Sequence, residues 1–224
     1  MRMKEIHLEM PLKEKDTSNL ELGDIVYLTG LLFTGRVGFY RMLFEKKMPP
    51  PVDIKTDCNV NFHCSPAVAE TSPGQYKIAS LTGTASFRFS RWIPPLLKDY
   101  GVKAVIGKGG MQPEIYMSAF RKNKAVYLTT VGYGLGAVYG KGLKRVVDVY
   151  WKEELGLAQA MWILETEKMG PFLVESDVNG NSLMEAARQD INPVFNALYD
   201  GLPQPSLKRI GEISSESGSD ITEL

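Results

Sequence analysis

The sequence predicts an α/β domain whose sheet is substantially parallel. Patterns typical of buried strands alternate with patterns of amphipathic helices from residue 25 to about residue 132. Further apolar runs at 144–151, 160–167 and 172–176 follow one another without long helices between them, so we expect a mixed sheet with helices packed around it. With 224 residues, 44% of them hydrophobic, the chain is long enough to bury a core.

The first half of the chain shows this alternation of strand and helix patterns. After about 20 polar residues, the segment 25–30 (IVYLTG) is apolar and β-branched and predicts a buried strand. The spacing of apolar residues predicts a helix over 37–47, and the prolines at 49–51 end it. The segments 58–64 and 76–83 predict strands, which the turn residues of 71–75 separate.

The second half repeats the pattern and then changes. We expect a helix over 85–101, a strand over 102–107, a helix over 113–123 and a strand over 125–132. A small-residue helix or loop at 134–142, the three late strands and a broken helix over 182–201 complete the domain. We therefore expect one domain over residues 1–202. The remainder, 203–224, is rich in Ser, Glu and Asp, and we expect a flexible polar tail there.

Composition excludes several partners. Lys+Arg and Asp+Glu are equal at 26 each, so no overall charge favours nucleic acid or a membrane, and anion recognition must be local. No apolar run approaches the roughly 18 residues that a spanning helix needs. The first residues, MRMKEIHLEMPLKEKD, lack the apolar core of a signal peptide. We expect a cytoplasmic protein.

The two cysteines, Cys58 and Cys64, do not predict a metal site. They lie six residues apart with His63 beside the second, whereas a structural zinc site or an iron–sulfur cluster needs about four ligands. We expect two reduced, buried thiols and no metal ligand in this chain. If a metal cofactor serves this protein, another chain must hold most of it.

Positive residues follow three of the predicted strands. Arg36, Arg88 and Lys108 stand in the segments FTGR, LTGTASFR and IGKGG. In open α/β sheets ligands collect at the carboxyl ends of strands, where helix N-termini also favour anions. Together these three cations can bind two carboxylates or a phosphate. Taken singly, each is as readily a solvated residue paired with an acid, and Thr84 is as readily a helix N-cap.

The ordered motifs resemble a known family. LELGDIVYLTG, T-x-R, HCSP, T-x-x-x-R, IGKGG and KAVYL occur in the order typical of the beta subunit, or C-terminal domain, of class I iron–sulfur hydro-lyases. These are fumarate hydratases and L(+)-tartrate dehydratases, and the resemblance covers about residues 4–200. It implies a swivelling β/β/α fold and an alpha subunit that holds a four-iron four-sulfur (4Fe-4S) cluster. It also implies assembly as a dimer of heterodimers.

The resemblance also implies an activity. It is the reversible hydration of a small dicarboxylate, with fumarate to malate expected first and L(+)-tartrate to oxaloacetate as the alternative. A non-catalytic partner subunit that docks an acidic surface, and a phosphate-ligand binder that acts alone, remain open. By resemblance Thr84 and Lys108 are catalytic, and the substrate-binding residues are Thr34, Arg36, Arg88, Lys108 and Gly109.

Three positions depart from the family's motifs. Val37 and Ser90 stand where the family has aspartates, and Tyr40 stands where it has a histidine. His63 and Pro66 match a histidine–glycine–proline stretch, with a serine in the glycine's place. These departures point to an unusual hydroxy-acid specificity or to a subunit with altered activity.

Overall fold

The computed structural model describes residues 3–132, 134–198 and 200–201. Contacts divide the chain after Ala186, and the first unit holds the sheets and all helices that end before this residue. The predicted polar tail, 203–224, lies outside the described residues. The predicted domain boundary at residue 202 therefore stays a prediction.

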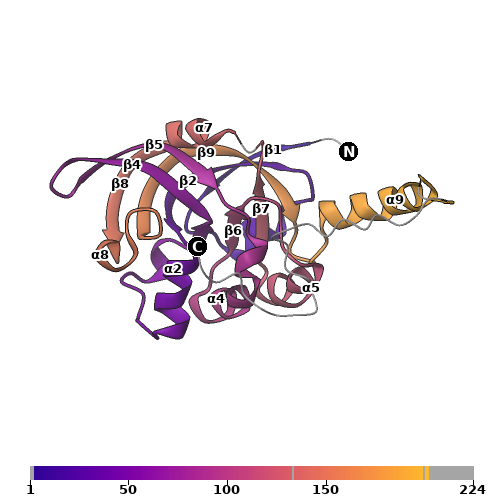
Figure 1. Cartoon of the computed structure of the whole chain (residues 1–224), viewed down its shortest axis with the longest axis horizontal. Coiled ribbons are helices and arrows are strands. Elements are labelled where there is room, and N and C mark those ends of the chain that lie inside the picture. The colour runs from indigo at the N-terminus through magenta and orange to yellow at the C-terminus, as the bar shows by residue number, and fades with distance from the viewer. Residues whose placement is uncertain (1–2, 133, 199, 202–224) are drawn as a thin grey trace. The chain divides into compact units, whose positions relative to one another are not determined.

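A seven-stranded sheet forms the centre of the first unit (Figure 1). Its strands are β1 (Glu5–Glu9), β2 (Ile25–Thr34), β3 (Val60–Phe62), β6 (Ala104–Gly107), β7 (Val126–Thr130), β9 (Met161–Ser176) and β8 (Leu143–Tyr150), in the spatial order given. A separate hairpin consists of β4 (Cys64–Ser72) and β5 (Gln75–Gly83).

The sheet is mixed, as the sequence predicts. Strands β1, β2, β3, β6 and β7 pair in parallel, and β9 runs antiparallel to β2, β7 and β8. Because β2 pairs with both β3 and β9, and β9 also pairs with β7, the ring of strands closes on itself. The carboxyl ends of the parallel strands consequently lie along one rim.

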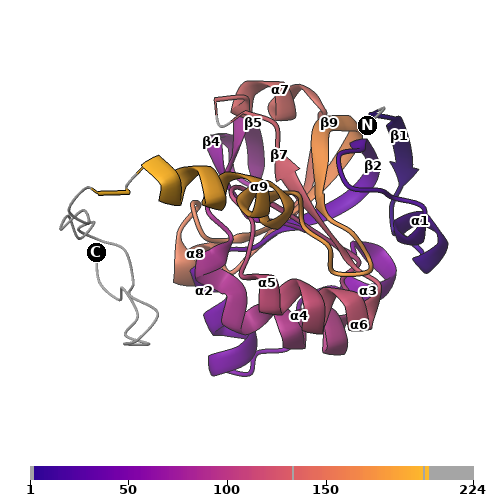
Figure 2. The same cartoon turned by 90° about the vertical axis from the view of Figure 1, so that its right-hand side faces the viewer.

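Helices cover one face of this sheet, and Figure 2 shows α4, α5 and α6 side by side beneath it. The helices of the first unit are α1 (Glu14–Ser18), α2 (Val37–Tyr40), η1 (Arg41–Glu45), α3 (Ile54–Asp57), η2 (Phe87–Trp92), α4 (Ile93–Tyr100), α5 (Pro113–Ile115), η3 (Tyr116–Phe120), α6 (Arg121–Asn123), α7 (Gly136–Lys141) and α8 (Lys152–Leu155). The last helix, α9 (Leu183–Leu198), crosses the division after Ala186 and has Pro193 inside it. No helix among the described residues is long and apolar enough to cross a membrane.

Two apolar clusters lie on opposite faces of the sheet. Leu32 and Phe33 are neighbours on β2 and belong to different clusters, because successive side chains of a strand point to opposite faces. The cluster of Phe33 includes Tyr40, Leu96 and Phe120 from the covering helices. Strands buried on both faces explain why the sequence shows continuous apolar runs there rather than alternation.

The structure differs from the sequence-based expectation at three places. The strand expected over 58–64 ends at Phe62 as β3, and a separate strand, β4, begins at Cys64 and continues to Ser72. The polar N-terminal segment contains β1 and α1, which carry a weak apolar signal because only Ile6 and Leu8 of β1 are half-buried at the sheet edge. The predicted strands 160–167 and 172–176 are one continuous strand, β9. Its pairing with β2 and β7 carries the intervening residues 168–171 through the sheet, with Met169 opposite Leu28.

Candidate functional site

The motif segments meet at the carboxyl ends of β2, β3 and β6. Backbone hydrogen bonds join them in sequence: the Gly35 amide donates to the Phe62 carbonyl (3.1 Å), and the His63 amide donates to the Ile106 carbonyl (2.8 Å). The Thr84 amide in turn donates to the His63 carbonyl (2.7 Å), which returns the chain from the β4–β5 hairpin to the same rim. Segments far apart in the sequence are thus neighbours.

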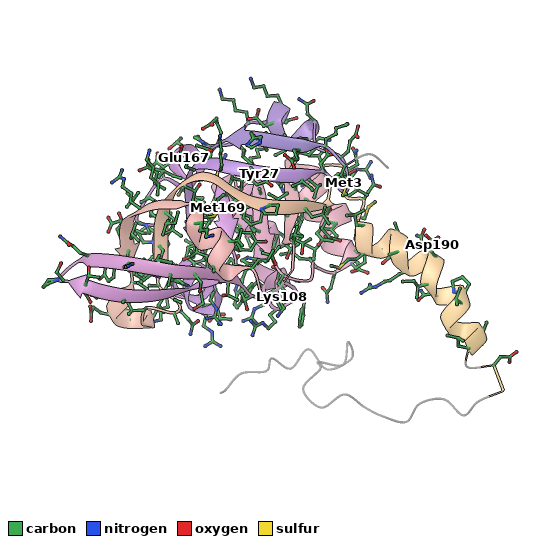
Figure 3. The ribbon with its side chains drawn as sticks, turned by 90° about the horizontal axis from the view of Figure 1, so that it is seen from above. Met3, Tyr27, Lys108, Glu167, Met169 and Asp190 are labelled. Carbon is green, nitrogen blue, oxygen red and sulfur yellow. The ribbon has the colours of Figure 1, made fainter. Side chains whose placement is uncertain are left out.

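Thr84 and Lys108 lie on segments that pair directly. The Lys108 amide donates to the Thr84 carbonyl, and the Ser86 amide donates to the Lys108 carbonyl, both over 3.1 Å. Ala85 and Lys108 form a parallel β-bridge between them. Figure 3 shows Lys108 at the edge of the domain, away from Tyr27 and Met169.

The two predicted arginines lie close to each other. Arg88 donates from Nη2 to the Thr84 hydroxyl over 2.5 Å. Burial, and after it the charge of Arg88, lower the pKa of Arg36. Among the ion pairs of the described residues none includes Arg36 or Arg88. Arg36 donates from Nη1 to the Ala158 carbonyl (3.4 Å), while its Nε is buried without a hydrogen-bond partner.

Thr34 makes different contacts from the other predicted site residues. Its side chain is 1% exposed, and its hydroxyl donates to the Ala160 carbonyl (3.3 Å) and accepts from the Trp162 amide (3.1 Å). Both bonds tie the end of β2 to β9. These contacts give Thr34 a role in fixing the strand end before Arg36, and its assignment as a substrate contact stays a prediction.

The glycines around Lys108 have separate physical roles. Gly109 has a φ of +85°, and a side chain added there would meet nothing within 4 Å, so its backbone is open to a ligand. Gly107 is closely packed instead, because an added Cβ would lie 1.9 Å from the Ser86 hydroxyl oxygen. The turn is anchored at its far side, where the Met111 amide donates to the Tyr116 hydroxyl (2.8 Å).

A buried polar cluster lies under this rim, and sequence reasoning missed it. Its five members, all 0% exposed, are Tyr40, Asn61, His63, Ser86 and Tyr127. The Tyr40 hydroxyl lies 2.6 Å from His63 Nε2 and 3.0 Å from Asn61 Oδ1. The Ser86 hydroxyl lies 2.7 Å from both His63 Nδ1 and the Tyr127 hydroxyl. The only available sequence signal was a set of polar residues at the ends of apolar runs.

This environment determines the charge of His63. Burial, and after it the charge of Arg88, lower its pKa to about 3, so the imidazole is neutral at physiological pH. Burial likewise raises the pKa of the Tyr40 hydroxyl. The cluster is therefore a neutral hydrogen-bonded network rather than a set of charges.

The cysteines do not fit an iron–sulfur cluster in this chain. Cys58 and Cys64 are both free and buried, as predicted, and burial raises the pKa of the Cys58 thiol to about 12 and that of Cys64 further. Thiolates are the ligands that such clusters need. No group of three metal-ligating side chains is present in the part of the chain that the structure describes.

Fold and site together define a class of protein. The chain is a mixed α/β domain with a closed sheet, and the segments of Arg36, Arg88 and Lys108 lie at the carboxyl ends of its parallel strands, where ligands collect in α/β folds. The comparison with protein families is more specific: the family model described as "Fumarase C-terminus" matches residues 1–187. The chain belongs to this family, which confirms the resemblance that its motifs indicate.

Named relatives agree with this membership. The protein named "L(+)-tartrate dehydratase subunit beta" from Escherichia coli (strain K12) is 32% identical over 182 residues, which cover 81% of this chain and 87% of that protein. "Putative L(+)-tartrate dehydratase subunit beta" from Methanocaldococcus jannaschii is 31% identical over 84% of this chain and 95% of its own length. "Putative fumarate hydratase class I" from Geobacillus stearothermophilus is 30% identical over 80% of this chain and 34% of its own length.

Proposed function

We propose that this chain is the beta subunit of a two-chain hydro-lyase that reversibly hydrates a small dicarboxylic acid. Fumarate and L(+)-tartrate are the candidate substrates. Two relatives named for tartrate dehydratase match along nearly their full lengths, whereas the fumarate hydratase relative matches over a third of its own. These names support the reaction class and leave the choice of acid to experiment.

One observation carries the proposal. Arg36 has a buried Nε without a hydrogen-bond partner, and burial, followed by the charge of the nearby Arg88, lowers the pKa of its guanidinium. Two neighbouring guanidinium groups without a carboxylate partner repel each other, and the buried Arg36 Nε is left unsatisfied. A bound dicarboxylate would relieve both costs, because its oxygens accept from guanidinium donors in a bidentate geometry.

The iron–sulfur cluster belongs, in this proposal, to an alpha subunit that pairs with this chain. The two buried, protonated thiols found here do not fit it. The cluster would supply Lewis-acid activation of the substrate. We also propose the dimer of heterodimers and the cytoplasmic location that the motifs led us to expect.

The residues of this chain would supply the remainder of the pocket. Arg36, Arg88 and Lys108 bind the carboxylates and stabilise the negative charge that develops when the neighbouring carbon loses its proton. The open backbone at Gly109 admits the substrate beside Lys108. Thr84 is the proposed proton-transfer residue, since the Arg88 guanidinium on its hydroxyl favours the deprotonated form of that oxygen.

A non-catalytic interaction subunit is the second candidate. The observation in its favour is that Val37, Tyr40 and Ser90 are neutral where the family's motifs have two aspartates and a histidine. In that case the cations would bind an acidic surface of the alpha subunit. The assembled pair would then be inactive, or its activity would not depend on these side chains.

Assembly with the alpha subunit and steady-state kinetics test the proposal. Lys108→Ala and Arg88→Ala are each expected to lower kcat/KM by about 30- to 1,000-fold, the loss typical of one charged donor in the transition state. Arg121→Ala, which removes an exposed arginine of α6, is the matched control and is expected to be parental. Parental kcat/KM in both site variants would refute the proposed roles, and a pair inactive on all small dicarboxylates would favour the second candidate.

A further inference from the structure

The buried polar cluster under the rim is a chain of hydrogen bonds between side chains from several elements of the fold. Each of its five polar side chains comes from a different place in the fold. Asn61 is on β3, Tyr127 on β7 and Tyr40 on α2, while His63 and Ser86 lie in the segments that follow β3 and β5. All five are fully buried, so their polar atoms depend on protein partners rather than on water, and within the cluster only Asn61 Nδ2 is buried without a hydrogen-bond partner.

The direction of the hydrogen bonds follows from the orientation of the Asn61 amide, whose Oδ1 rather than Nδ2 faces the Tyr40 hydroxyl. The Asn61 Oδ1 atom can only accept, so the single hydroxyl proton of Tyr40 is used on it. The Tyr40 oxygen must then accept from His63 Nε2–H. A neutral imidazole protonated on Nε2 accepts at Nδ1, where the Ser86 hydroxyl donates, and Ser86 accepts from the Tyr127 hydroxyl.

We propose that this relay, Tyr127 to Ser86 to His63 to Tyr40 to Asn61, positions the Thr84–Arg88 segment against Lys108 for catalysis. Its members are positioning residues, since none is shown to touch substrate. The inference rests on the function proposed above and adds specific residues to it.

Ser86 is the point where the relay meets the site. It lies between Thr84 and Arg88 in the sequence, and its backbone amide donates to the Lys108 carbonyl. Its hydroxyl is the single link between Tyr127 on one side and His63 on the other. Fixing one side chain therefore fixes both the proposed proton-transfer hydroxyl and the guanidinium beside it. Misplacement of about 1 Å in such groups can cost up to a hundredfold in rate.

The packing of Gly107 supports the same assignment. A Cβ at this position would lie 1.9 Å from the Ser86 oxygen and 2.8 Å from the Tyr127 hydroxyl. The first glycine of IGKGG is thus required by the relay rather than by a ligand. The motif therefore combines a glycine that leaves room for the relay with Lys108, whose backbone pairs with the Thr84–Ser86 segment.

The first test uses the full chain alone and needs no activity. Long-range proton–nitrogen NMR correlations of the imidazole rings report which nitrogen is protonated, and His7→Gln assigns the two histidines of the chain. We expect His63 to be neutral and protonated on Nε2 at pH 6. Protonation on Nδ1, or an imidazolium, would overturn the proposed relay.

The second test uses the complex with the alpha subunit. Ser86→Ala and Tyr40→Phe are each expected to lower kcat/KM by tenfold to a hundredfold. Ser118→Ala is the matched control: its hydroxyl donates to the Glu114 carbonyl (2.6 Å) one turn earlier, outside the motif segments, and we expect parental kinetics. Unfolding midpoints measured in parallel separate a loss of stability from a loss of rate. Parental kinetics in Ser86→Ala would refute the positioning role.

A third measurement distinguishes failure of the relay from failure of the proposed function. Backbone amide shifts of residues 84–88 and 108 are compared between the parent, Ser86→Ala and Ser118→Ala in the full chain. We expect changes at 108 in Ser86→Ala alone. If these occur while the parental complex hydrates no dicarboxylate, the relay holds and the proposed function fails. Unchanged shifts at 108 would refute the relay whatever the activity.

Discussion

The close packing of Gly107 against Ser86 allows a quantitative prediction for Gly107→Ala. The new methyl group would lie 1.9 Å from the Ser86 oxygen, whereas ordinary contacts between heavy atoms are about 3.5 Å or longer. The strand cannot move aside, because β6 pairs with β3 on one side and β7 on the other. The Ser86 hydroxyl must therefore leave its place.

The cost has two parts. Overpacking in a core typically costs about 1–3 kcal/mol. Displacing the hydroxyl also breaks its bonds to His63 and Tyr127, each worth about 1 kcal/mol. We expect Gly107→Ala to lower the free energy of unfolding by about 4 kcal/mol. Urea titration followed by tryptophan fluorescence measures this, since Trp92 and Trp162 are both buried.

A double-mutant cycle identifies the cause. Ser86→Ala removes the colliding oxygen, so Gly107→Ala should cost about 2 kcal/mol less in that background than in the parent. Gly134→Ala adds the same methyl group where nothing lies within 4 Å, and we expect a change below about 0.5 kcal/mol. Strict additivity of the two substitutions, or a loss below about 1 kcal/mol in Gly107→Ala, would refute the packing argument.

Three further predictions concern the same region. Thr34→Val leaves the Trp162 amide without its acceptor, so unfolding free energy should fall by about 1–3 kcal/mol while substrate KM stays parental; a large rise in KM would instead support Thr34 as a substrate contact. Because its pKa is raised to about 12, the Cys58 thiol should not react with a disulfide reagent at pH 8 until urea unfolds the chain, and rapid reaction of the native chain would contradict its burial. The pKa of His63 is lowered to about 3, so above about pH 6.5 the imidazole is neutral in both the folded and the unfolded state and does not affect stability. As the pH falls from about 6.5 toward 3, only the unfolded state takes up the proton, and the free energy of unfolding should drop by about 1 kcal/mol per pH unit. His63→Gln should remove this pH dependence and His7→Gln should keep it.

The sequence predicted most of the fold because its signals are local. Residues 25–30 are apolar and β-branched, and the structure has β2 there. The helix over 37–47 corresponds to α2 and η1, whose apolar spacing matches burial against one face. β1 was missed because an edge strand with only half-buried Ile6 and Leu8 carries little of that signal.

The candidate site was predicted in part for a similar reason. Arg36, Arg88 and Lys108 stand in segments with recurring glycine and threonine, and the carboxyl-end rule brought them together before any coordinates. His63 was identified only through the resemblance. Ser86 gave no local signal, since nothing in its neighbours shows that Tyr127, 41 residues away, donates to it.

The sequence alone therefore determined the alternation of strands and helices, the family and the choice of the candidate cations. Hydrophobic periodicity and motif order are properties of contiguous residues and need no coordinates. Only the tertiary structure decided which polar groups are buried together, because hydrogen bonds between Tyr40, His63, Ser86 and Tyr127 join residues that the closed sheet and the hairpin return place side by side. That contact pattern, and the room that Gly107 leaves for it, exist only once the chain is folded.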